Sequence, residues 1–236
     1  MNERHLSERL IRVANYVPKG AKVADIGSDH AYLPCYLCLD DPECTAIAGE
    51  VNEGPFQSAK KQVEKSGLAE RIDVRKGNGL EVLAPNEVDT VTIAGMGGSL
   101  ISTILDEGRD KLEGVKTLIL QPNVSAHIIR RWLRENGWLL IAEEILEEDN
   151  KIYEILIANR GDDTYLYEEH TEQKILLGPY LIKEANSAFH RKWQEELKNW
   201  KRVLAQFENA NANEQVEQKR RELLNQISMV EEVLVQ

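Results

Sequence analysis

The sequence of 236 residues lacks any long apolar stretch. It contains no run of about 18 uncharged apolar residues, which is the minimum for a transmembrane helix. The first ten residues, MNERHLSERL, are charged from the third position and include no apolar segment of the kind found in secretory signals. We therefore expect a cytoplasmic protein that has no membrane partner.

Cysteine is scarce as well, with only Cys35, Cys38 and Cys44. An odd number of cysteines without an export signal predicts reduced thiols. Together with His30 they are four potential zinc ligands, but their spacing matches no known zinc pattern. Cys35 and Cys38 lie in an apolar segment, where cysteine behaves as a small hydrophobic residue. We expect no metal site.

The chain also has no excess of positive charge, because 29 Lys and Arg stand against 40 Asp and Glu, a net charge of −11. This balance argues against sequence-independent binding of nucleic acid over a broad basic surface. Residues 171–236 contain ten basic and ten acidic residues, so the whole deficit lies in residues 1–170. A nucleic-acid partner would therefore bind local basic patches.

What the sequence does contain is a regular alternation of strand-like and helix-like segments. Strands are predicted at residues 21–27, 44–51, 71–77, 88–98 and 115–123, the fourth running into a glycine-rich loop. Amphipathic or apolar helices are predicted at residues 4–17, 31–39, 55–67, 99–108 and 125–137. This alternation indicates an α/β fold with a mainly parallel sheet. Residues 138–161 contain two strand-like runs joined by EEDNK, which predicts a terminal antiparallel hairpin.

The C-terminal part has a different pattern. Residues 164–181 are typical of a linker or docking segment, and two apolar seams follow at residues 189–207 and 216–234. Seams at alternating steps of three and four, separated by an Asn-rich turn, predict an antiparallel helical hairpin of the coiled-coil type. We predict a Rossmann-like domain over residues 1–163 and a helical domain over residues 164–236.

The turn after the first strand, DIGSDHA at residues 25–31, has one glycine where dinucleotide-binding turns have three. Gly27 is present, but Asp29 and Ala31 occupy the next two glycine positions. Asp25 and Asp29 would repel a pyrophosphate, whereas S-adenosylmethionine (SAM) carries an ammonium and a sulfonium. The turn favours SAM, and an NAD(P)-dependent oxidoreductase is the less favoured alternative.

The ends of the next strands carry further candidates. Glu50 is placed to bind the ribose hydroxyls, Asn78 to pair with the adenine edge, and Met96 to pack against the ligand. Each also has an ordinary structural interpretation, as a solvated strand end, a turn former and a core residue respectively. The predicted cofactor-binding residues are Asp25, Gly27, Ser28, Asp29, His30, Glu50, Val51, Asn52, Gly77, Asn78, Gly79, Ala94, Gly95, Met96 and Gly97.

Six segments, DIGSDHAYLP, AGEVN, KGNGL, TIAGMGG, LQPN and DNKIYEIL, together closely resemble the bacterial tRNA (adenine22-N1)-methyltransferases. The resemblance covers essentially the whole chain, including the departure from glycine at Asp29 and Ala31. It implies a class I fold with a helical C-terminal domain, and methyl transfer from SAM to N1 of adenine 22 in the D-arm region of tRNA. From the residues alone, the conclusion ends at a SAM-dependent methyltransferase. Another RNA or small-molecule substrate, or a non-catalytic SAM- and RNA-binding adaptor, stays open.

The resemblance also suggests catalytic residues. Because the methylated base is cationic, a carboxylate close to it would stabilise the product, and we expect Asp29 in that role. Asp29 has two alternative roles, which are binding the SAM ammonium and capping the following helix. Asn123 is expected to bond the substrate base, and Tyr153 either stacks on that base or fills the core of the hairpin.

A tRNA substrate requires basic contacts. The candidates are Arg4, Arg9, Arg130, Arg131, Arg134, Arg191, Lys198, Lys201 and Arg202. The alternative is that these side chains form ordinary solvated helix faces. The helical hairpin is suited either to tRNA binding or to dimerisation, and we predict a monomer that uses it to hold tRNA.

Overall fold

A computed structural model describes residues 5–207 and 214–235. It divides the chain into two compact units. Unit 1 comprises Met1–Glu144 and Tyr153–Asp163, and unit 2 comprises Ile145–Ile152 and Thr164–Gln236. The assignment of residues 1–163 to catalysis and 164–236 to tRNA binding stays a prediction. Within the described residues, no helix is both long and apolar enough to cross a membrane.

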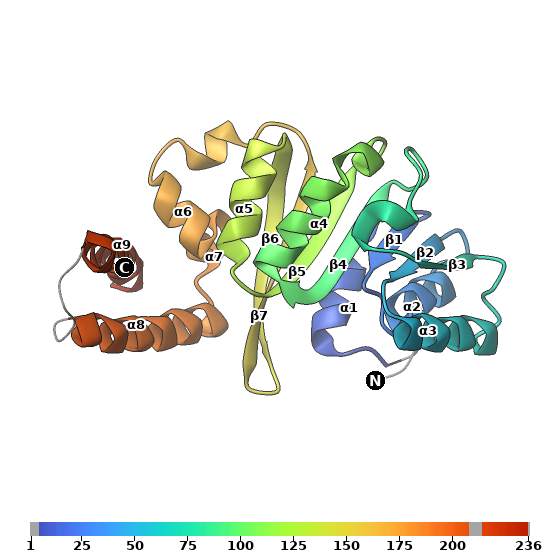
Figure 1. The fold of residues 1–236 in the computed structure, drawn as a ribbon, viewed down its shortest axis with the longest axis horizontal. Helices are drawn as coiled ribbons and strands as arrows, with labels where there is room; N and C mark the ends of the chain where they lie inside the picture. Colours follow the sequence, from blue (N-terminus) through green and yellow to red (C-terminus); the bar gives the residue numbers. More distant parts are fainter. Residues whose placement is uncertain (1–4, 208–213, 236) are drawn as a thin grey trace. The chain divides into compact units, whose positions relative to one another are not determined.

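A seven-stranded sheet of order β3-β2-β1-β4-β5-β7-β6 forms the centre of unit 1 (Figure 1). The strands are β1 (Lys22–Ile26), β2 (Thr45–Glu50), β3 (Ile72–Lys76), β4 (Thr90–Gly97), β5 (Thr117–Val124), β6 (Trp138–Glu148) and β7 (Lys151–Arg160). The first five strands pair in parallel, and β7 pairs antiparallel with β5. The predicted parallel sheet with a terminal antiparallel hairpin is thus confirmed.

Helices on both faces bury the sheet of unit 1. They are α1 (Glu8–Asn15), α2 (Tyr32–Asp40), α3 (Glu53–Lys65), α4 (Gly98–Glu107) and α5 (Ala126–Glu135), with short 3-10 helices η1 (Gly79–Val82) and η2 (Arg109–Leu112). Right-handed crossovers on either side of β1 place α2 and α3 on one face and α4 and α5 on the other. Because both faces are covered, the central strands carry continuous apolar runs. Val91, Ile93, Leu118 and Leu120 are completely buried.

The strand order reverses between β1 and β4, and the carboxyl ends of these two strands mark the switch point where ligands bind in open α/β sheets. The prediction that the fourth strand runs into a glycine-rich loop is wrong, because α4 begins at Gly98 directly after the strand. β4 continues to Gly97, with Met96 paired to Pro122 and Gly97 paired to Val124. Two register shifts interrupt the pairing, so the segment is a bulged strand that stays bonded to β5.

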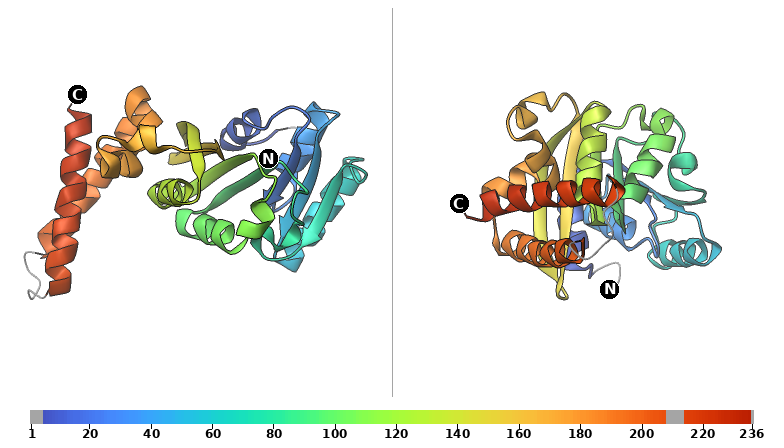
Figure 2. Two further views of the ribbon diagram at one scale, coloured as in Figure 1. Left: turned by 90° about the horizontal axis from the view of Figure 1, so that it is seen from above. Right: turned by 60° about the vertical axis from the view of Figure 1, so that its left-hand side comes forward.

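Unit 2 is helical apart from the tip of the β6–β7 hairpin. It contains η3 (Thr164–Tyr167), α6 (Thr171–Leu177), α7 (Pro179–Glu184), α8 (Ser187–Phe207) and α9 (Glu214–Leu234). The two long helices pack side by side (Figure 2), which confirms a helical C-terminal region. Whether their packing is that of a coiled coil stays a prediction.

The core of unit 2 corrects one expectation about residues 164–181. That segment is more than a linker, because Leu177 and Leu181 are completely buried in a cluster with Phe189, Trp193 and Val230. The short helices α6 and α7 thus form part of the packed core. The other side chains of this cluster come from the apolar seams of α8 and α9, from Leu176 on α6 and from Ile145 on β6.

Candidate functional site

The turn after β1 is fixed to the end of β2 by backbone hydrogen bonds. Gly27 and Ser28 donate their N–H groups to the carbonyl oxygen of Gly49, at 2.9 and 3.2 Å. The Asp25 carboxylate accepts hydrogen bonds from Ser28 Oγ at 2.6 Å and from Thr92 Oγ1 at 2.7 Å. Burial raises the pKa of Asp25 to about 6, although both hydroxyls act to lower it. Asp25 is thus bonded both to the turn and to β4, and its contact with a cofactor stays a prediction.

Asp29 and Ala31, the two residues at the missing glycine positions, both adopt the left-handed backbone conformation. Their φ angles are 55° and 53°, a region that costs a non-glycine residue about 1 kcal/mol. Two non-glycine residues of this turn thus adopt a backbone conformation that glycine adopts most readily. The Asp29 N–H donates to the Glu50 carboxylate, while the Asp29 side chain is 65% exposed. His30 stacks on Tyr32, with ring centroids 5.2 Å apart.

Glu50 connects the turns that follow β1, β2 and β3. Its side chain is buried, and burial raises the pKa of the carboxyl while the Asp29 N–H acts to lower it. The Gly77 N–H donates to the Glu50 carbonyl oxygen at 2.9 Å, which brings the third turn beside the second. Val51 is exposed next to Glu50, and Asn52 is the cap residue that precedes α3. The predicted residues of these three turns therefore lie close together.

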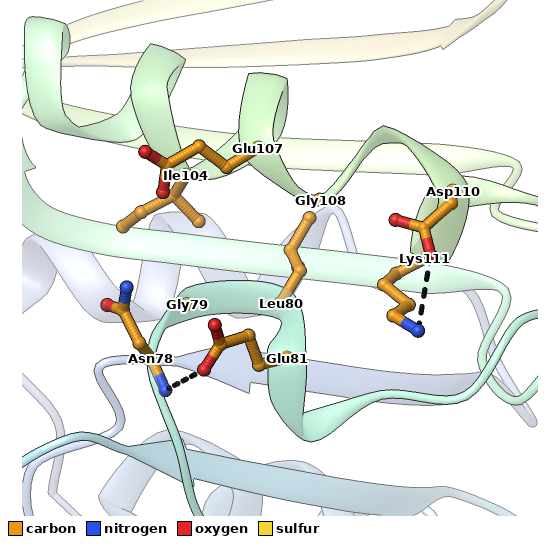
Figure 3. A pocket seen from close by; sticks show the side chains of 9 residues that line it. All are labelled: Asn78, Gly79, Leu80, Glu81, Ile104, Glu107, Gly108, Asp110 and Lys111. Carbon is orange, nitrogen blue, oxygen red and sulfur yellow. Dashed lines mark hydrogen bonds and ion pairs between the residues drawn. The ribbon is translucent and has the colours of Figure 1, made fainter.

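Asn78 lies next to a small pocket between η1 and α4 (Figure 3). Its N–H donates to Glu81 Oε2 at 3.3 Å, and its side chain points toward α4. A Cβ atom on Gly79 would lie 3.0 Å from Ile104 Cγ2, so η1 packs closely against α4. The pocket is lined by Asn78, Gly79, Leu80, Glu81, Ile104, Glu107, Gly108, Asp110 and Lys111. The role of Asn78 in binding adenine stays a prediction.

Side-chain amides organise the paired ends of β4 and β5. Asn123 Nδ2 donates to the Gly95 carbonyl oxygen at 2.8 Å. Gln121 Oε1 accepts the Gly95 N–H at 3.0 Å, and Gln121 Nε2 lies 3.4 Å from Asn123 Oδ1. Gln121 is completely buried, whereas Asn123 is exposed. The buried amide thus fixes the backbone of the bulged strand and the exposed amide beside it.

Arg9 and Tyr153 complete this second cluster. The Arg9 guanidinium donates to Gln121 Oε1 and lies 5.0 Å from the centroid of the Tyr153 ring. Residues from α1, β5 and β7, far apart in the sequence, therefore meet at one place. A Cβ atom on Gly27 would lie 2.2 Å from Met96 Cε, so the Met96 side chain packs onto the turn after β1. Met96 links the amide cluster to the acidic turn.

Sequence reasoning missed Gln121 and Thr92. Gln121 is the polar residue that ends the apolar run TLIL of β5, and Thr92 lies within the buried run of β4. A polar residue at a position that strand patterning predicts to be buried is a signal for a structural hydrogen-bond partner. The partners themselves, Gly95 and Asp25, come from other strands and have no signature in the local sequence.

The basic residues predicted to bind RNA in unit 1 differ widely in exposure. The prediction for Arg130 is wrong, because its side chain is completely buried and paired with Glu143 at 2.5 Å and Glu154 at 2.8 Å. Arg130 lies on the inner face of α5. Because Arg131 and Arg134 are close to it in the sequence, all three arginines were predicted to be exposed. Arg131 and Arg134 are exposed on the same helix. Arg4 lies outside the described residues.

In unit 2 the predicted RNA-binding residues all lie on α8. Arg191 pairs with Glu147 and, at 3.0 Å, with Glu195. Lys201 pairs with Glu231 on α9 at 2.5 Å. Lys198 and Arg202 are exposed, and no ion pair holds either of them within the described part of the chain. These two are the basic side chains of α8 that are open to a partner.

The cysteines are buried and unbridged. Cys35, Cys38 and Cys44 are free thiols, and Cys38 Sγ donates to the Cys44 carbonyl oxygen at 3.4 Å. Across residues 5–207 and 214–235, the structure contains no group of three or more His, Cys, Asp or Glu side chains that could hold a metal ion.

Comparisons with known proteins agree on one family. Residues 23–232 match the family model described as TrmK, tRNA (adenine(22)-N(1))-methyltransferase. The tRNA (adenine(22)-N(1))-methyltransferase of Bacillus subtilis (strain 168) is 51% identical over 99% of both chains. The crystal structure of the B. subtilis M1A22 tRNA methyltransferase TrmK has a TM-score of 0.94 at 50% identity, covering 98% of this chain and 99% of that one. The structure of Streptococcus pneumoniae Sp1610 in complex with S-adenosyl-L-methionine has a TM-score of 0.85 at 42% identity, covering 98% and 100%.

Proposed function

Because the chain belongs to the tRNA (adenine(22)-N(1))-methyltransferase family, we propose that it transfers the methyl group of SAM to N1 of adenine 22 in tRNA. The observation that carries the proposal is the pairing of an acidic turn with an amide cluster at one edge of the sheet. The first suits a cationic cofactor, and the second suits a purine base. Met96 packs between them, so a ligand on the turn and a base on the amides would lie next to each other.

The carboxylates in and beside the turn fit SAM. Glu50 is a buried carboxylate at the strand end, where two hydroxyls of a ribose are the natural hydrogen-bond donors. Asp29 and Asp25 add negative charge, which favours a ligand with an ammonium and a sulfonium. When bound, SAM supplies an electrophilic methyl group and becomes S-adenosylhomocysteine as the carbon–sulfur bond breaks. We assign the ribose to Glu50 and the adenine of the cofactor to the turn around Asn78.

The substrate adenine needs no base to be activated. N1 carries a lone pair in the neutral ring, so the role of the protein is to align N1 with the methyl group. N1 lies on the Watson–Crick edge, and a paired adenine has to leave its helix to present it. Tyr153 lies against the Arg9 guanidinium, and Asn123 is connected to Arg9 through Gln121. Asn123 and Tyr153 are the residues we assign to holding the extruded base.

The Asp29 carboxylate is exposed and lies 3.7 Å from His30 Nε2, and we assign it to stabilising the cationic 1-methyladenine. Its backbone N–H is already used by Glu50, and this bond holds the residue in its left-handed conformation. An Asp29→Asn variant is expected to lose turnover while its affinity for SAM changes less. Unchanged turnover would restrict Asp29 to the ammonium or to a structural role.

We further propose a cytoplasmic monomer that binds tRNA through exposed basic side chains of α5 and α8. The apolar seams of α8 and α9 are used within unit 2, so they require no second copy of the chain. Light scattering of the free protein and of a tRNA mixture would measure the stoichiometry. A stable dimer in the absence of tRNA would contradict the monomer.

The decisive experiment is a methylation assay on defined tRNA. The protein is incubated with SAM and an unmodified tRNA that carries adenine at position 22, and the tRNA is digested and analysed for 1-methyladenosine by mass spectrometry. We expect new 1-methyladenosine that vanishes when adenine 22 is replaced by guanine. SAM binding without methylation would point to another substrate or to an adaptor, and absence of SAM binding would overturn the proposal as a whole.

A further inference from the structure

The amide cluster at the ends of β4 and β5 has a defined donor and acceptor polarity. Gln121 Oε1 is fixed as the acceptor because both groups that donate to it, the Gly95 N–H and the Arg9 guanidinium, can only donate. Gln121 Nε2 is therefore the donor, to the Pro122 carbonyl at 2.9 Å and to Asn123 Oδ1 at 3.4 Å. The orientation of the buried amide follows from groups whose hydrogen-bonding character cannot change.

The same polarity is passed to Asn123. Its Oδ1 accepts from Gln121 and its Nδ2 donates to the Gly95 carbonyl, which can only accept. An amide has two N–H donors and two lone pairs on its oxygen. Asn123 consequently retains one N–H and one lone pair, and its side chain is exposed. Neither of these remaining positions has a partner within the described residues.

One N–H beside one lone pair matches an adenine edge. An amide pairs with adenine either at N6 and N7 or at N6 and N1. The second arrangement would occupy N1, which is the atom to be methylated under the function proposed above. Only pairing with N6 and N7 leaves N1 free.

We infer that Asn123 holds the target adenine through its N7 and its N6 amino group, and that Gln121 is the positioning residue that sets the orientation of the Asn123 amide. This inference rests on the proposed function. It accounts for base selection, because guanine presents acceptors at both O6 and N7, and the fixed Oδ1 of Asn123 would oppose O6. Arg9 contributes by fixing Gln121 and therefore acts inside unit 1.

The test uses tRNA with either adenosine or 7-deazaadenosine at position 22, since the analogue keeps N1 and N6 but has no acceptor at position 7. Single-turnover methylation rates are compared for the wild type, Asn123→Ala and Gln121→Glu. Loss of one hydrogen bond slows the wild type by about tenfold on the analogue. Any effect of the altered ring on N1 itself is common to all variants. It cancels when the adenosine-to-analogue rate ratio of one variant is compared with that of another.

In Asn123→Ala the adenosine rate is expected to fall, and the rate ratio of adenosine to 7-deazaadenosine is expected to be about tenfold smaller than in the wild type. Gln121→Glu should show the same two changes as Asn123→Ala. A carboxylate cannot donate to Asn123 Oδ1, so the exposed amide of Asn123 loses its fixed orientation. Gln62→Glu is the matched control, since Gln62 lies on α3 and its side chain donates to Ser66 Oγ at 3.0 Å, outside the amide cluster. It should retain the wild-type rates and the full difference between substrates.

Equal sensitivity to 7-deazaadenosine in the wild type and in Asn123→Ala would overturn the inference while leaving the proposed function intact. A Gln121→Glu variant that is slow but keeps the full sensitivity would show a structural role only, and would overturn the positioning role. A wild-type chain that does not methylate adenosine 22 at all would overturn the proposed function itself.

Discussion

The two units of the chain use charged side chains in opposite ways. Every buried charged residue in the described part of the chain lies in unit 1, and the six are Asp25, Glu50, Arg130, Glu143, Glu154 and Asp163. In unit 2 the described charged side chains are all at least partly exposed. A buried charge requires a specific partner, whereas an exposed charge is screened by solvent and salt. Substitutions of charge are therefore expected to be severe in unit 1 and mild in unit 2.

The largest effect is expected for Arg130→Met. Loss of the guanidinium removes the positive charge that pairs with the buried carboxylates of Glu143 and Glu154, which is expected to lower the free energy of unfolding by about 3–5 kcal/mol. Urea unfolding followed by circular dichroism measures the change. The loss should become smaller at acidic pH, where the two carboxyl groups take up protons.

Arg191→Met is the matched control for that substitution. Arg191 also pairs with two glutamates, Glu147 and Glu195, but all three side chains are solvent-exposed. The urea midpoint should hardly change, because exposed ion pairs contribute little. If Arg191→Met destabilises the protein as much as Arg130→Met does, the contrast between the two units is wrong.

Glu50→Gln is expected to have the next largest effect, on cofactor binding. A neutral amide still accepts the Asp29 N–H, but it removes the charge that we assign to the ribose hydroxyls. The affinity for SAM measured by calorimetry should fall by about a hundredfold. Glu53→Gln makes the same change three residues further on, at an exposed side chain paired with Lys76, and should leave the affinity as it is. Equal losses in both variants would refute the specific role of Glu50.

A pH dependence is expected from Asp25. Its pKa is about 6 in the folded chain because of burial, against an ordinary value of 3.8. The folded state therefore binds the proton more tightly, and the contribution to stability is present below pH 4 and is lost as the pH rises through 6. In Asp25→Asn this loss should disappear. Between pH 4 and pH 7, the free energy of unfolding of the variant should rise by about 2 kcal/mol relative to that of the wild type, as measured by urea titration. The same difference between variant and wild type at both pH values would contradict this.

The smallest effect is expected in unit 2, for the double variant Lys198→Ala/Arg202→Ala. These exposed residues are four positions apart on α8, so they lie on the same face. The KM for tRNA should rise by about threefold to tenfold, with a weaker dependence on salt. Lys61→Ala/Lys65→Ala removes two exposed charges with the same spacing from α3 and should not change KM. An equal rise in both variants would indicate a general charge effect.

Much of the fold was predictable because its signals are local. Apolar runs alternate with amphipathic segments from residue 21 to 137, and the hairpin is indicated by two strand-like runs with no room for a helix. Residues 94–98 were not predictable in this way. A segment this rich in glycine favours a loop, but pairing of Met96 with Pro122 and of Gly97 with Val124 keeps β4 in the sheet up to Gly97, and Gly98 begins α4.

The candidate site was predictable where one turn supplies the residues, as at Asp25, Gly27 and Asp29. It was not predictable where partners come from distant strands. Gln121 has no motif of its own, and its importance follows from Gly95 and Arg9, which the fold brings to it. The RNA-binding prediction for Arg130 was wrong for the same reason. Its partners Glu143 and Glu154 lie on β6 and β7, and they allow the guanidinium to be buried.

The assignment of the hairpin tip, Ile145–Ile152, to unit 2 has a consequence for protein engineering. The chain passes from one unit to the other three times, so no single cut separates them. A protein truncated after residue 163 would keep Ile145 and Ile152 but lose the helices that bury them. Its inactivity would report an exposed apolar surface as much as the loss of a tRNA-binding element. A separable catalytic fragment would need the tip replaced by a short polar turn.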